Sequence, residues 1–152
     1  MMVKNQMKNK MMNLVYKAST KSDIHKIFEF SKNLIDEYED IQNIDYEKVL
    51  KWVYKKIEEN IHEYTSIYLD NTLVGYYHFH EDKDKMELDD FNIFSEYQNK
   101  GIGSKVLSEL IQTENTIYLY VFVKNVKAIK LYERFGFKIV EYVNKTRYIM
   151  ER

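Results

Sequence analysis

Half of the glycine in this chain lies in one short segment. The chain has 152 residues, four glycines and no proline, and Gly101 and Gly103 both fall within "EYQNKGIGSK". The preceding residues, Met86–Phe94, have the composition of a strand, and apolar side chains follow at helical spacing. Glycine adopts backbone conformations that other residues avoid. The sequence therefore predicts a strand, a tight loop and a helix that begins at the glycines.

A helix that begins after a glycine loop is suited to binding phosphate. Its first turn has unpaired N–H groups and the positive end of the helix dipole, and glycines let a ligand approach the backbone. Two common phosphate motifs do not fit: Gly103 precedes Ser104-Lys105 instead of Lys-Ser, and position 106, where a dinucleotide fingerprint has glycine, is Val. The segment indicates a pyrophosphate cradle, with a plain turn before a helix as the alternative.

The composition is that of one globular domain. Hydrophobic residues make up 45% and charged residues 31%, no apolar run is long enough to span a membrane, and there is no cysteine. Disulfides, thiolate metal sites and a cysteine nucleophile are thus excluded. We expect a flexible leader at 1–11, a domain at 12–152 and a cytoplasmic location, since the leader lacks the apolar stretch of a secretory signal.

The hydrophobic pattern predicts an α/β (α+β) fold of order β-α-α-β-β-β-α-β-α-β-β. About seven strands form a mixed, mostly antiparallel sheet, and four helices accompany them. Asp45 is expected to cap the second helix, and Asp70-Asn71 to form a tight hairpin turn. Segment 116–123 is nearly all apolar and predicts a strand covered on both faces. The predicted strands are 12–18, 64–69, 72–80, 85–94, 116–123, 137–143 and 147–150, and the predicted helices start at Ser22, Asp45, Gly101 and Asn125.

Charge is unevenly distributed along the chain. Residues 1–35 carry seven basic and two acidic groups, 36–96 carry six basic and seventeen acidic groups, and 97–152 carry ten basic and five acidic groups. Solvated surface explains most individual charges. The polarity nevertheless predicts an anionic ligand near the C-terminal third and a cationic one near the acidic middle.

Two segments together resemble a known family. Gln98-x-x-Gly101-x-Gly103 follows a strand, and Asn125, Ala128, Leu131, Tyr132, Gly136 and Phe137 come later at fixed spacing. This pattern and the element order resemble the GCN5-related N-acetyltransferase (GNAT) superfamily over about residues 12–150. The resemblance implies acetyl-CoA as cosubstrate, an amine as acceptor and no metal.

The resemblance also assigns residues to the acetyl-CoA site. It implies that backbone N–H groups bind the pyrophosphate, that Gln98 braces the loop, that Lys100 or Lys105 adds positive charge, and that a strand edge pairs with the pantetheine arm. This last contact requires the strands at 85–94 and 116–123 to splay apart. The expected site residues are Phe91, Asn92, Ile93, Gln98, Asn99, Lys100, Gly101, Ile102, Gly103, Ser104 and Asn125.

Catalytic roles follow from the same resemblance. Tyr132 is expected to protonate the departing sulfur, and Glu87 to deprotonate the amine, with Asp89 or solvent as alternatives. An amine with the pKa of lysine is neutral in only about one molecule in 2,500 at pH 7, so a base is useful. A backbone N–H near Ile93 or Phe94 is the expected oxyanion donor. In relatives that modify ribosomal protein N-termini, a glutamate serves as the base at the position that Tyr120 occupies here. The resemblance therefore disfavours a ribosomal protein as the acceptor.

We therefore predict an N-acetyltransferase acting by direct attack in a ternary complex. The acidic middle segment favours a cationic acceptor: a small amine, polyamine, aminoglycoside or lysine side chain. Two alternatives remain, a non-catalytic CoA-binding module and a toxin-like aminoacyl-tRNA acetyltransferase. No nucleic-acid or membrane partner is expected, and the sequence leaves a homodimer open. His78 and His80 share a strand face, but with no third ligand evident in the sequence we expect no metal site.

Overall fold

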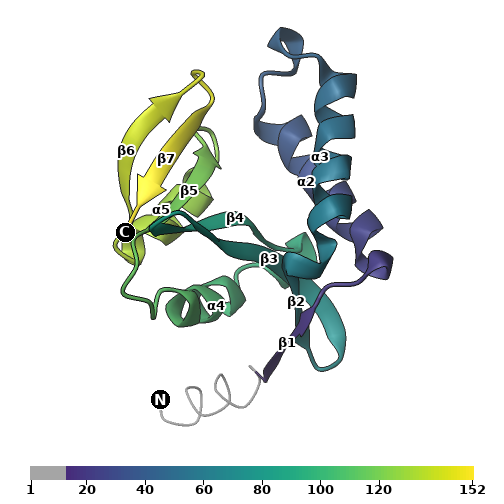
Figure 1. Cartoon of the computed structure of the whole chain (residues 1–152), viewed down its shortest axis with the longest axis vertical. Helices are drawn as coiled ribbons and strands as arrows, with labels where there is room; N and C mark the ends of the chain where they lie inside the picture. The colour runs from purple at the N-terminus through teal and green to yellow at the C-terminus, as the bar shows by residue number, and fades with distance from the viewer. Residues whose placement is uncertain (1–12) are drawn as a thin grey trace.

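The computed structural model describes residues 13–152, so the predicted leader lies outside the described residues. The strands are β1 Leu14–Ala18, β2 Tyr64–Leu69, β3 Thr72–Asp82, β4 Lys85–Ile93, β5 Ile117–Phe122, β6 Lys138–Val143 and β7 Arg147–Glu151. They form one sheet of order β1-β2-β3-β4-β5-β7-β6 (Figure 1). Every neighbouring pair is antiparallel except β4 and β5, which are parallel.

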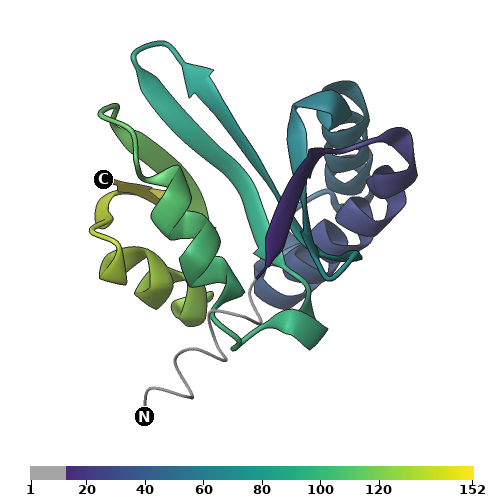
Figure 2. The ribbon, with the colours of Figure 1, turned by 90° about the horizontal axis from the view of Figure 1, so that it is seen from below.

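Helices cover both faces of the sheet (Figure 2). One face packs against α2 and α3, and the other against α4 and α5. This arrangement confirms the predicted fold class and element order. Within residues 13–152 the four α-helices are α2 Ile24–Tyr38, α3 Tyr46–Asn60, α4 Ile102–Leu110 and α5 Val126–Arg134. Short 3-10 turns lie at η1 Lys21–Asp23, η2 Ile41–Asn43, η3 Ile61–Glu63 and η4 Ser95–Tyr97.

Local signals in the sequence set several element boundaries. The Asp45 side chain accepts a hydrogen bond from the Lys48 amide at 3.3 Å and so caps α3, as predicted. Asp70 and Asn71 have φ values of 50° and 65°, which confirms the tight turn between β2 and β3. The predicted start of the first helix at Ser22 was slightly early, because η1 precedes α2.

The core divides along the two faces of the sheet. Side chains from α2 and α3 bury Tyr64 and Tyr76 on one face, and α4 and α5 bury Leu88, Leu119 and Met150 on the other. Apolar burial of this kind contributes ~25 cal/mol per Å² and provides most of the driving force for folding.

The prediction that β5 is covered on both faces was wrong. Ile117, Leu119 and Val121 are buried against α4 and α5, whereas the Tyr120 side chain on the opposite face is 50% exposed. Tyrosine is apolar enough to resemble a core residue in a hydrophobicity pattern, but its hydroxyl tolerates water.

A β-bulge interrupts β4 at Asp90. His78 pairs with Asp89 and Tyr77 with Phe91, so Asp90 is an extra residue, and its φ is 58°. The bulge shifts the alternation of side chains by one position. Phe91 therefore packs on the α4 face, although Asp89, two positions earlier, lies on the α3 face.

Among residues 13–152, no helix combines the length and the apolar character that crossing a bilayer requires.

Candidate active site

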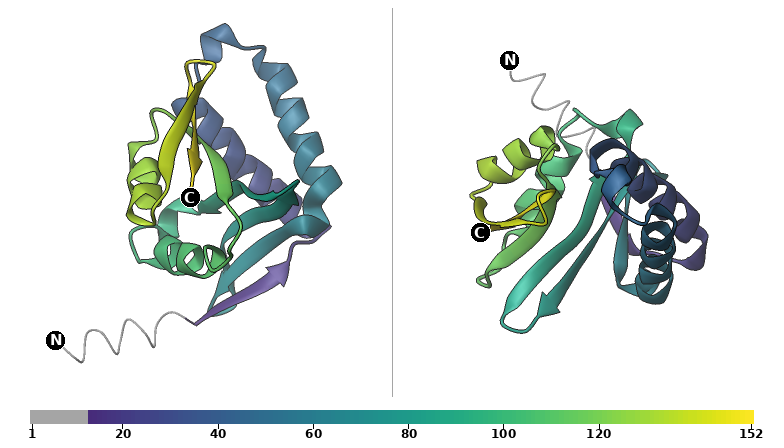
Figure 3. Two further views of the ribbon diagram at one scale, coloured as in Figure 1. Left: turned by 60° about the vertical axis from the view of Figure 1, so that its left-hand side comes forward. Right: turned by 90° about the horizontal axis from the view of Figure 1, so that it is seen from above.

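A cleft opens where β4 and β5 separate. The two strands are paired only at Met86↔Ile117 and Glu87↔Tyr118. Beyond these pairs the sheet divides into two arms, which the views along the sheet show as a V (Figures 2 and 3). A cleft of about 900 Å³ lies there, lined by residues of α2, β4, α4, α5 and the loop before α4. The splay that the pantetheine contact requires is therefore present.

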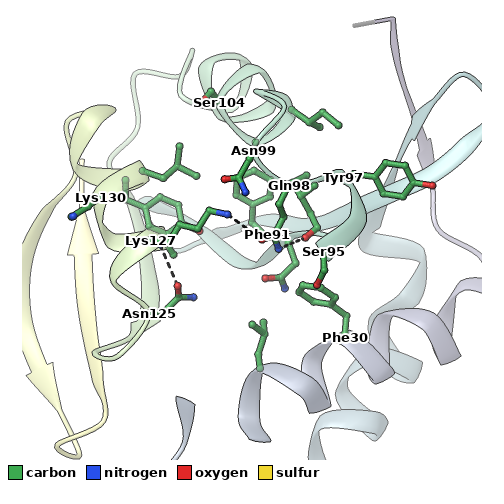
Figure 4. A pocket seen from close by; sticks show the side chains of 18 of the residues that line it. Phe30, Phe91, Ser95, Tyr97, Gln98, Asn99, Ser104, Asn125, Lys127 and Lys130 are labelled. Atoms are coloured by element: carbon green, nitrogen blue, oxygen red, sulfur yellow. Dashed lines mark hydrogen bonds between the residues drawn. The ribbon is translucent and has the colours of Figure 1, made fainter. Parts of the chain in front are cut away.

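The glycine loop forms one wall of this cleft. Gly101 has a φ of 84° and precedes α4, and Asn99 has a φ of 63°. The amides of Ile102, Gly103 and Ser104 lie in the first turn of α4 and have no intrahelical acceptor. All these residues line the cleft, so the positive end of the helix faces it (Figure 4). This is the geometry of an anion site at a helix N-terminus.

Gln98 holds the loop in place. Its side-chain nitrogen donates to the Ile93 carbonyl oxygen at 2.8 Å, and its side-chain oxygen accepts from the Lys127 ammonium at 3.2 Å (Figure 4). One side chain thus connects the end of β4, the loop and α5. These contacts agree with the bracing role that the family resemblance implies for Gln98.

A further glycine positions the strand edge beside the cleft. Gly75 of β3 lies opposite Ile93, and a Cβ added there would be 2.4 Å from the Asn92 carbonyl oxygen. Any side chain at Gly75 would push β4 away. The tight approach holds Asn92 and Ile93, whose edge borders the cleft. Asn92 is fixed further, because its amide donates to the Tyr76 hydroxyl at 2.9 Å.

The positive charge at the cleft comes chiefly from α5. Lys127, Lys130 and Arg134 line the cleft, and their spacing of three and four places them on one face of the helix. Figure 4 shows Lys127 extending toward Gln98. Lys100 does not line the cleft, and its ammonium lies 5.7 Å from the centre of the Tyr97 ring. Lys105 is also outside the lining and lies 3.7 Å from Glu109.

The opposite wall of the cleft is formed by α5, through Asn125 and Tyr132. The Asn125 side-chain oxygen accepts from the Ala128 amide at 3.2 Å and caps the helix, and both Asn125 and Tyr132 line the cleft. Tyr132 is only 7% exposed and packs edge-on against Phe137. Burial, together with the negative charge of Asp90, raises the pKa of the Tyr132 phenol above its ordinary value.

An acidic group of residues occupies the α3 face of β4. Glu87 lies 3.2 Å from His80, and Asp89 accepts from the Lys56 ammonium at 2.6 Å. Asp90 accepts from the Tyr64 hydroxyl at 2.8 Å. Burial and the nearby Asp89 carboxylate raise the pKa of Glu87. Burial opposes the ionisation of Asp89 as well, but the neighbouring His78 and Lys56 side chains outweigh it and lower the pKa of Asp89.

Residues 24–137 match the model of the acetyltransferase (GNAT) family, which is most of the chain. The chain belongs to the GNAT family. The seven-stranded sheet and the position of the cleft agree with this assignment, and the family resemblance seen in the sequence is confirmed.

Individual GNAT relatives match this chain to different extents. The spermine/spermidine N(1)-acetyltransferase of Bacillus subtilis is 47% identical over 57 residues, 34% of this chain and 38% of the relative. The acetyltransferase PseH of Campylobacter jejuni is 26% identical over 113 residues, 70% of this chain and 71% of the relative. The match therefore spans well under half the length of the spermine/spermidine enzyme.

A solved GNAT structure shares the fold over nearly the whole chain. The PaiA N-acetyltransferase of Thermoplasma acidophilum, in complex with coenzyme A, superposes with a TM-score of 0.73 and 20% identity. The superposition covers 93% of this chain and 99% of that one.

Most of the residues expected from the GNAT pattern meet at one cleft. Glu87 and Lys100 do not line it, since Glu87 lies on the α3 face and Lys100 beside Tyr97. The Phe94 amide donates to the Val74 carbonyl at 2.8 Å, which removes Phe94 as an oxyanion donor and leaves Ile93. The expected residues that line the cleft are Phe91, Asn92, Ile93, Gln98, Asn99, Gly101, Ile102, Gly103, Ser104, Asn125 and Tyr132.

The sequence analysis missed the basic face of α5. The sequence contains a pattern that could have revealed this face, because Lys127, Lys130 and Arg134 follow one another at helical spacing within the second family segment. These residues were counted only in the overall charge of the C-terminal third. Their orientation toward the glycine loop depends on how α5 packs.

Proposed function

We propose that this protein transfers an acetyl group from acetyl-CoA to a primary amine by direct attack in a ternary complex. The observation that carries the proposal is the cleft between β4 and β5, where the first turn of α4 and the buried Tyr132 face the same space. A phosphate-binding helix end and a proton donor are the two features that thioester aminolysis requires on the donor side.

The glycine loop and α5 are suited to bind the donor. The amides between Asn99 and Ser104 would hold the pyrophosphate, and the cations of Lys127 and Lys130 would balance its charge. The β4 edge at Asn92 and Ile93 would pair with the pantetheine arm in the manner of an added strand. Gln98 and Gly75 support this binding surface by holding the loop and the edge.

Tyr132 is suited to protonate the leaving sulfur. Burial and Asp90 raise the pKa of its phenol, so the proton stays on the oxygen until thiolate charge develops nearby. With ordinary values near 10 for a phenol and 8.5 for a thiol, the transfer is uphill by ~2 kcal/mol. The raised pKa adds to this cost, which a positioned donor can offset as the thiolate forms.

Glu87 is a better candidate base than Asp89. Its pKa is raised by burial and by Asp89, and a carboxylate with a raised pKa is the stronger base. Asp89 is bound by Lys56 and has a lowered pKa. Because Glu87 lies on the α3 face, outside the cleft lining, it would accept the proton of an amine that enters from that side, directly or through water.

The acceptor is a cationic amine. Glu63, Glu87, Asp89 and Asp90 gather on or beside the α3 face of β4, with the ammonium of Lys56 among them. Such a surface favours a cation. The local identity to a spermine/spermidine acetyltransferase supports a polyamine in particular, with small amines, aminoglycosides and lysine side chains as the other members of the class.

A panel of amines with acetyl-CoA, followed by thiol release, tests the proposal. We expect polyamines to be turned over with a higher kcat/KM than neutral amines of similar size, and this preference to decline as salt is added. Saturable acetyl-CoA binding without turnover of any amine would favour a non-catalytic module. A kcat/KM that depends on neither the charge of the acceptor nor the ionic strength would contradict a cationic acceptor.

A further inference from the structure

Two histidines and two carboxylates face one another across β3 and β4. In the register of the two strands, His78 stands opposite Asp89 and His80 opposite Glu87. The histidine rings lie side by side with centroids 4.5 Å apart. Ligand atoms of His78, His80 and Asp89 all fall within 4.8 Å of one another.

Each histidine has one ring nitrogen already held by an oxygen. Nε2 of His78 lies 3.0 Å from a Glu63 carboxylate oxygen, and Nδ1 of His80 lies 3.1 Å from the Glu81 carbonyl oxygen. A carbonyl oxygen requires the proton on Nδ1 of His80, and a carboxylate favours it on Nε2 of His78. The free lone pairs of the neutral rings then lie on Nδ1 of His78 and Nε2 of His80. Metal-binding histidines are oriented by oxygens in this way.

The free nitrogen of His78 lacks a hydrogen-bond partner within the described part of the chain. His78 is only 3% exposed, and its Nδ1 is buried and unpaired. The nearest Asp89 oxygen is 3.6 Å away, which is too long for a hydrogen bond. A bare nitrogen facing a carboxylate is unfavourable unless a cation lies between them. Burial disfavours a charged ring, but Asp89 and Glu63 outweigh it and raise the pKa of His78, so this cation is either a ring proton or a metal ion that replaces the proton.

The free nitrogen of His80 faces a carboxylate in the same way. Its Nε2 lies 3.2 Å from Glu87 Oε1. The set is therefore two imidazole nitrogens and two carboxylates, a combination that suits Zn²⁺ and is soft enough to disfavour Mg²⁺. Ligands around a tetrahedral zinc are ~3.4 Å apart. The partly exposed side chains of His80 and Glu87 have room to rotate to that spacing.

We propose that His78, His80, Asp89 and Glu87 form a zinc-binding site on the α3 face of β4. Four carboxylates, those of Glu63, Glu87, Asp89 and Asp90, lie around the site together with the ammonium of Lys56, so a divalent cation reduces their mutual repulsion. Lys56 contacts Oδ2 of Asp89, which is also the oxygen nearest to His78 Nδ1, so the metal either displaces the ammonium from Oδ2 or binds Oδ1. Zinc held there occupies the carboxylate of Glu87, so zinc inhibits acetyl transfer; this consequence, unlike the site itself, rests on the proposed function.

Calorimetric titration of ZnCl₂ into chelator-treated protein tests the site directly. We expect one zinc per chain, and at least tenfold weaker binding in the variants His80→Gln and Asp89→Asn. The matched control is His25→Gln, an exposed histidine on α2, which should bind zinc like the unaltered protein. Titration with MgCl₂ should give no saturable binding.

A spectroscopic readout separates this site from adventitious binding. Co²⁺ in a tetrahedral site absorbs visible light, and we expect this absorption in the unaltered protein and in His25→Gln but not in His80→Gln. A thermal shift with acetyl-CoA that is retained in His80→Gln shows that the variant is folded. Absent zinc binding, or equal affinity in the unaltered protein and His80→Gln, overturns the proposal.

Inhibition is measured separately from binding. For each variant, turnover with chelator is compared with turnover in excess zinc, and the ratio is expected to be large for the unaltered protein and close to one for His80→Gln. Zinc that binds at these residues without slowing turnover would support the site and remove Glu87 from the mechanism.

Discussion

Glu87 of β4 stands directly opposite Tyr118 of β5, and this is the last register pair before the two strands diverge. The proposed base therefore lies at the vertex of the V, on the α3 face, while Tyr132 lies in the cleft bounded by α4 and α5. Asp90 connects the two regions electrostatically, because its charge adds to burial in raising the pKa of both Tyr132 and Tyr76. A thioester reaching the vertex would be open to an amine from the opposite face of the sheet.

Replacing Tyr132 with phenylalanine should lower turnover at least tenfold while acetyl-CoA affinity changes by no more than a few-fold. The ring keeps its packing against Phe137, and only the proton donor is lost. Steady-state kinetics and calorimetric titration of acetyl-CoA give the two numbers. Unchanged turnover would remove Tyr132 from the mechanism.

The pH dependence should show that Tyr132 stays protonated in alkali. An unperturbed phenol is about half ionised at pH ~10, whereas burial and Asp90 raise the pKa of Tyr132 above that value. A raised pKa extends the neutral form to higher pH. The ratio of kcat in the unaltered protein to kcat in Tyr132→Phe should therefore stay constant from about pH 8 to pH 10. A ratio that declines toward one near pH 10 would show an ordinary phenol.

Glu87→Gln should lower kcat, and the loss should grow as the pH falls from alkaline toward neutral, because more of the acceptor amine is protonated. The loss should shrink again in acid, where the raised pKa of Glu87 leaves its carboxylate protonated and unable to act as a base. Asp89→Asn is the comparison: if Glu87 is the base, its loss costs more turnover than the loss of Asp89, whose carboxylate is already bound by Lys56. Both variants are assayed with chelator present, so that no metal affects the result. If Glu87→Gln keeps the full turnover of the unaltered protein at every pH, the base is solvent or Asp89 instead.

The two loop glycines should respond differently to alanine. Gly101 has a φ of 84°, so Gly101→Ala should lower the free energy of unfolding by ~1–2 kcal/mol. A Cβ at Gly103 would meet Ile93 and Leu131 at 3.7 Å, an ordinary contact, so Gly103→Ala should melt like the unaltered protein. The added methyl lies at the cleft wall and should weaken acetyl-CoA binding. Thermal melts measure the stability of both variants, and calorimetric titrations measure their affinity for acetyl-CoA. Unchanged acetyl-CoA affinity in Gly103→Ala would show that the pyrophosphate binds elsewhere.

Lysines on α5 should matter more for the donor than the lysine within the glycine loop. Lys127→Gln and Lys130→Gln should each weaken acetyl-CoA binding several-fold and reduce its dependence on salt, because both cations line the cleft. Lys100→Gln is the matched control, with its ammonium over the Tyr97 ring and outside the lining. Titrations at low and high salt measure the effect. A greater loss in Lys100→Gln than in Lys127→Gln would reverse the assignment.

Much of the site could be predicted because the two segments that resemble the family are short patterns along the chain. Gly101 lies at a helix start, where a left-handed residue is observed, and Tyr132 lies two helical turns after Asn125, so both address the same cleft. Lys127 and Lys130 were missed because a basic helix face is usually solvated surface. Only the packing of α5 against β5 turns that face toward the loop.

What the sequence by itself determined is the set of elements, their order and the residues of the glycine loop, since turns, caps and hydrophobic spacing depend on neighbours along the chain. The register between strands was decided by the tertiary structure alone. The bulge at Asp90 changes which side chains face α4, and the pairing of His78 with Asp89 and His80 with Glu87 joins two short motifs into one cluster. Such contacts arise from hydrogen bonding and packing between segments distant in sequence, which no local pattern records.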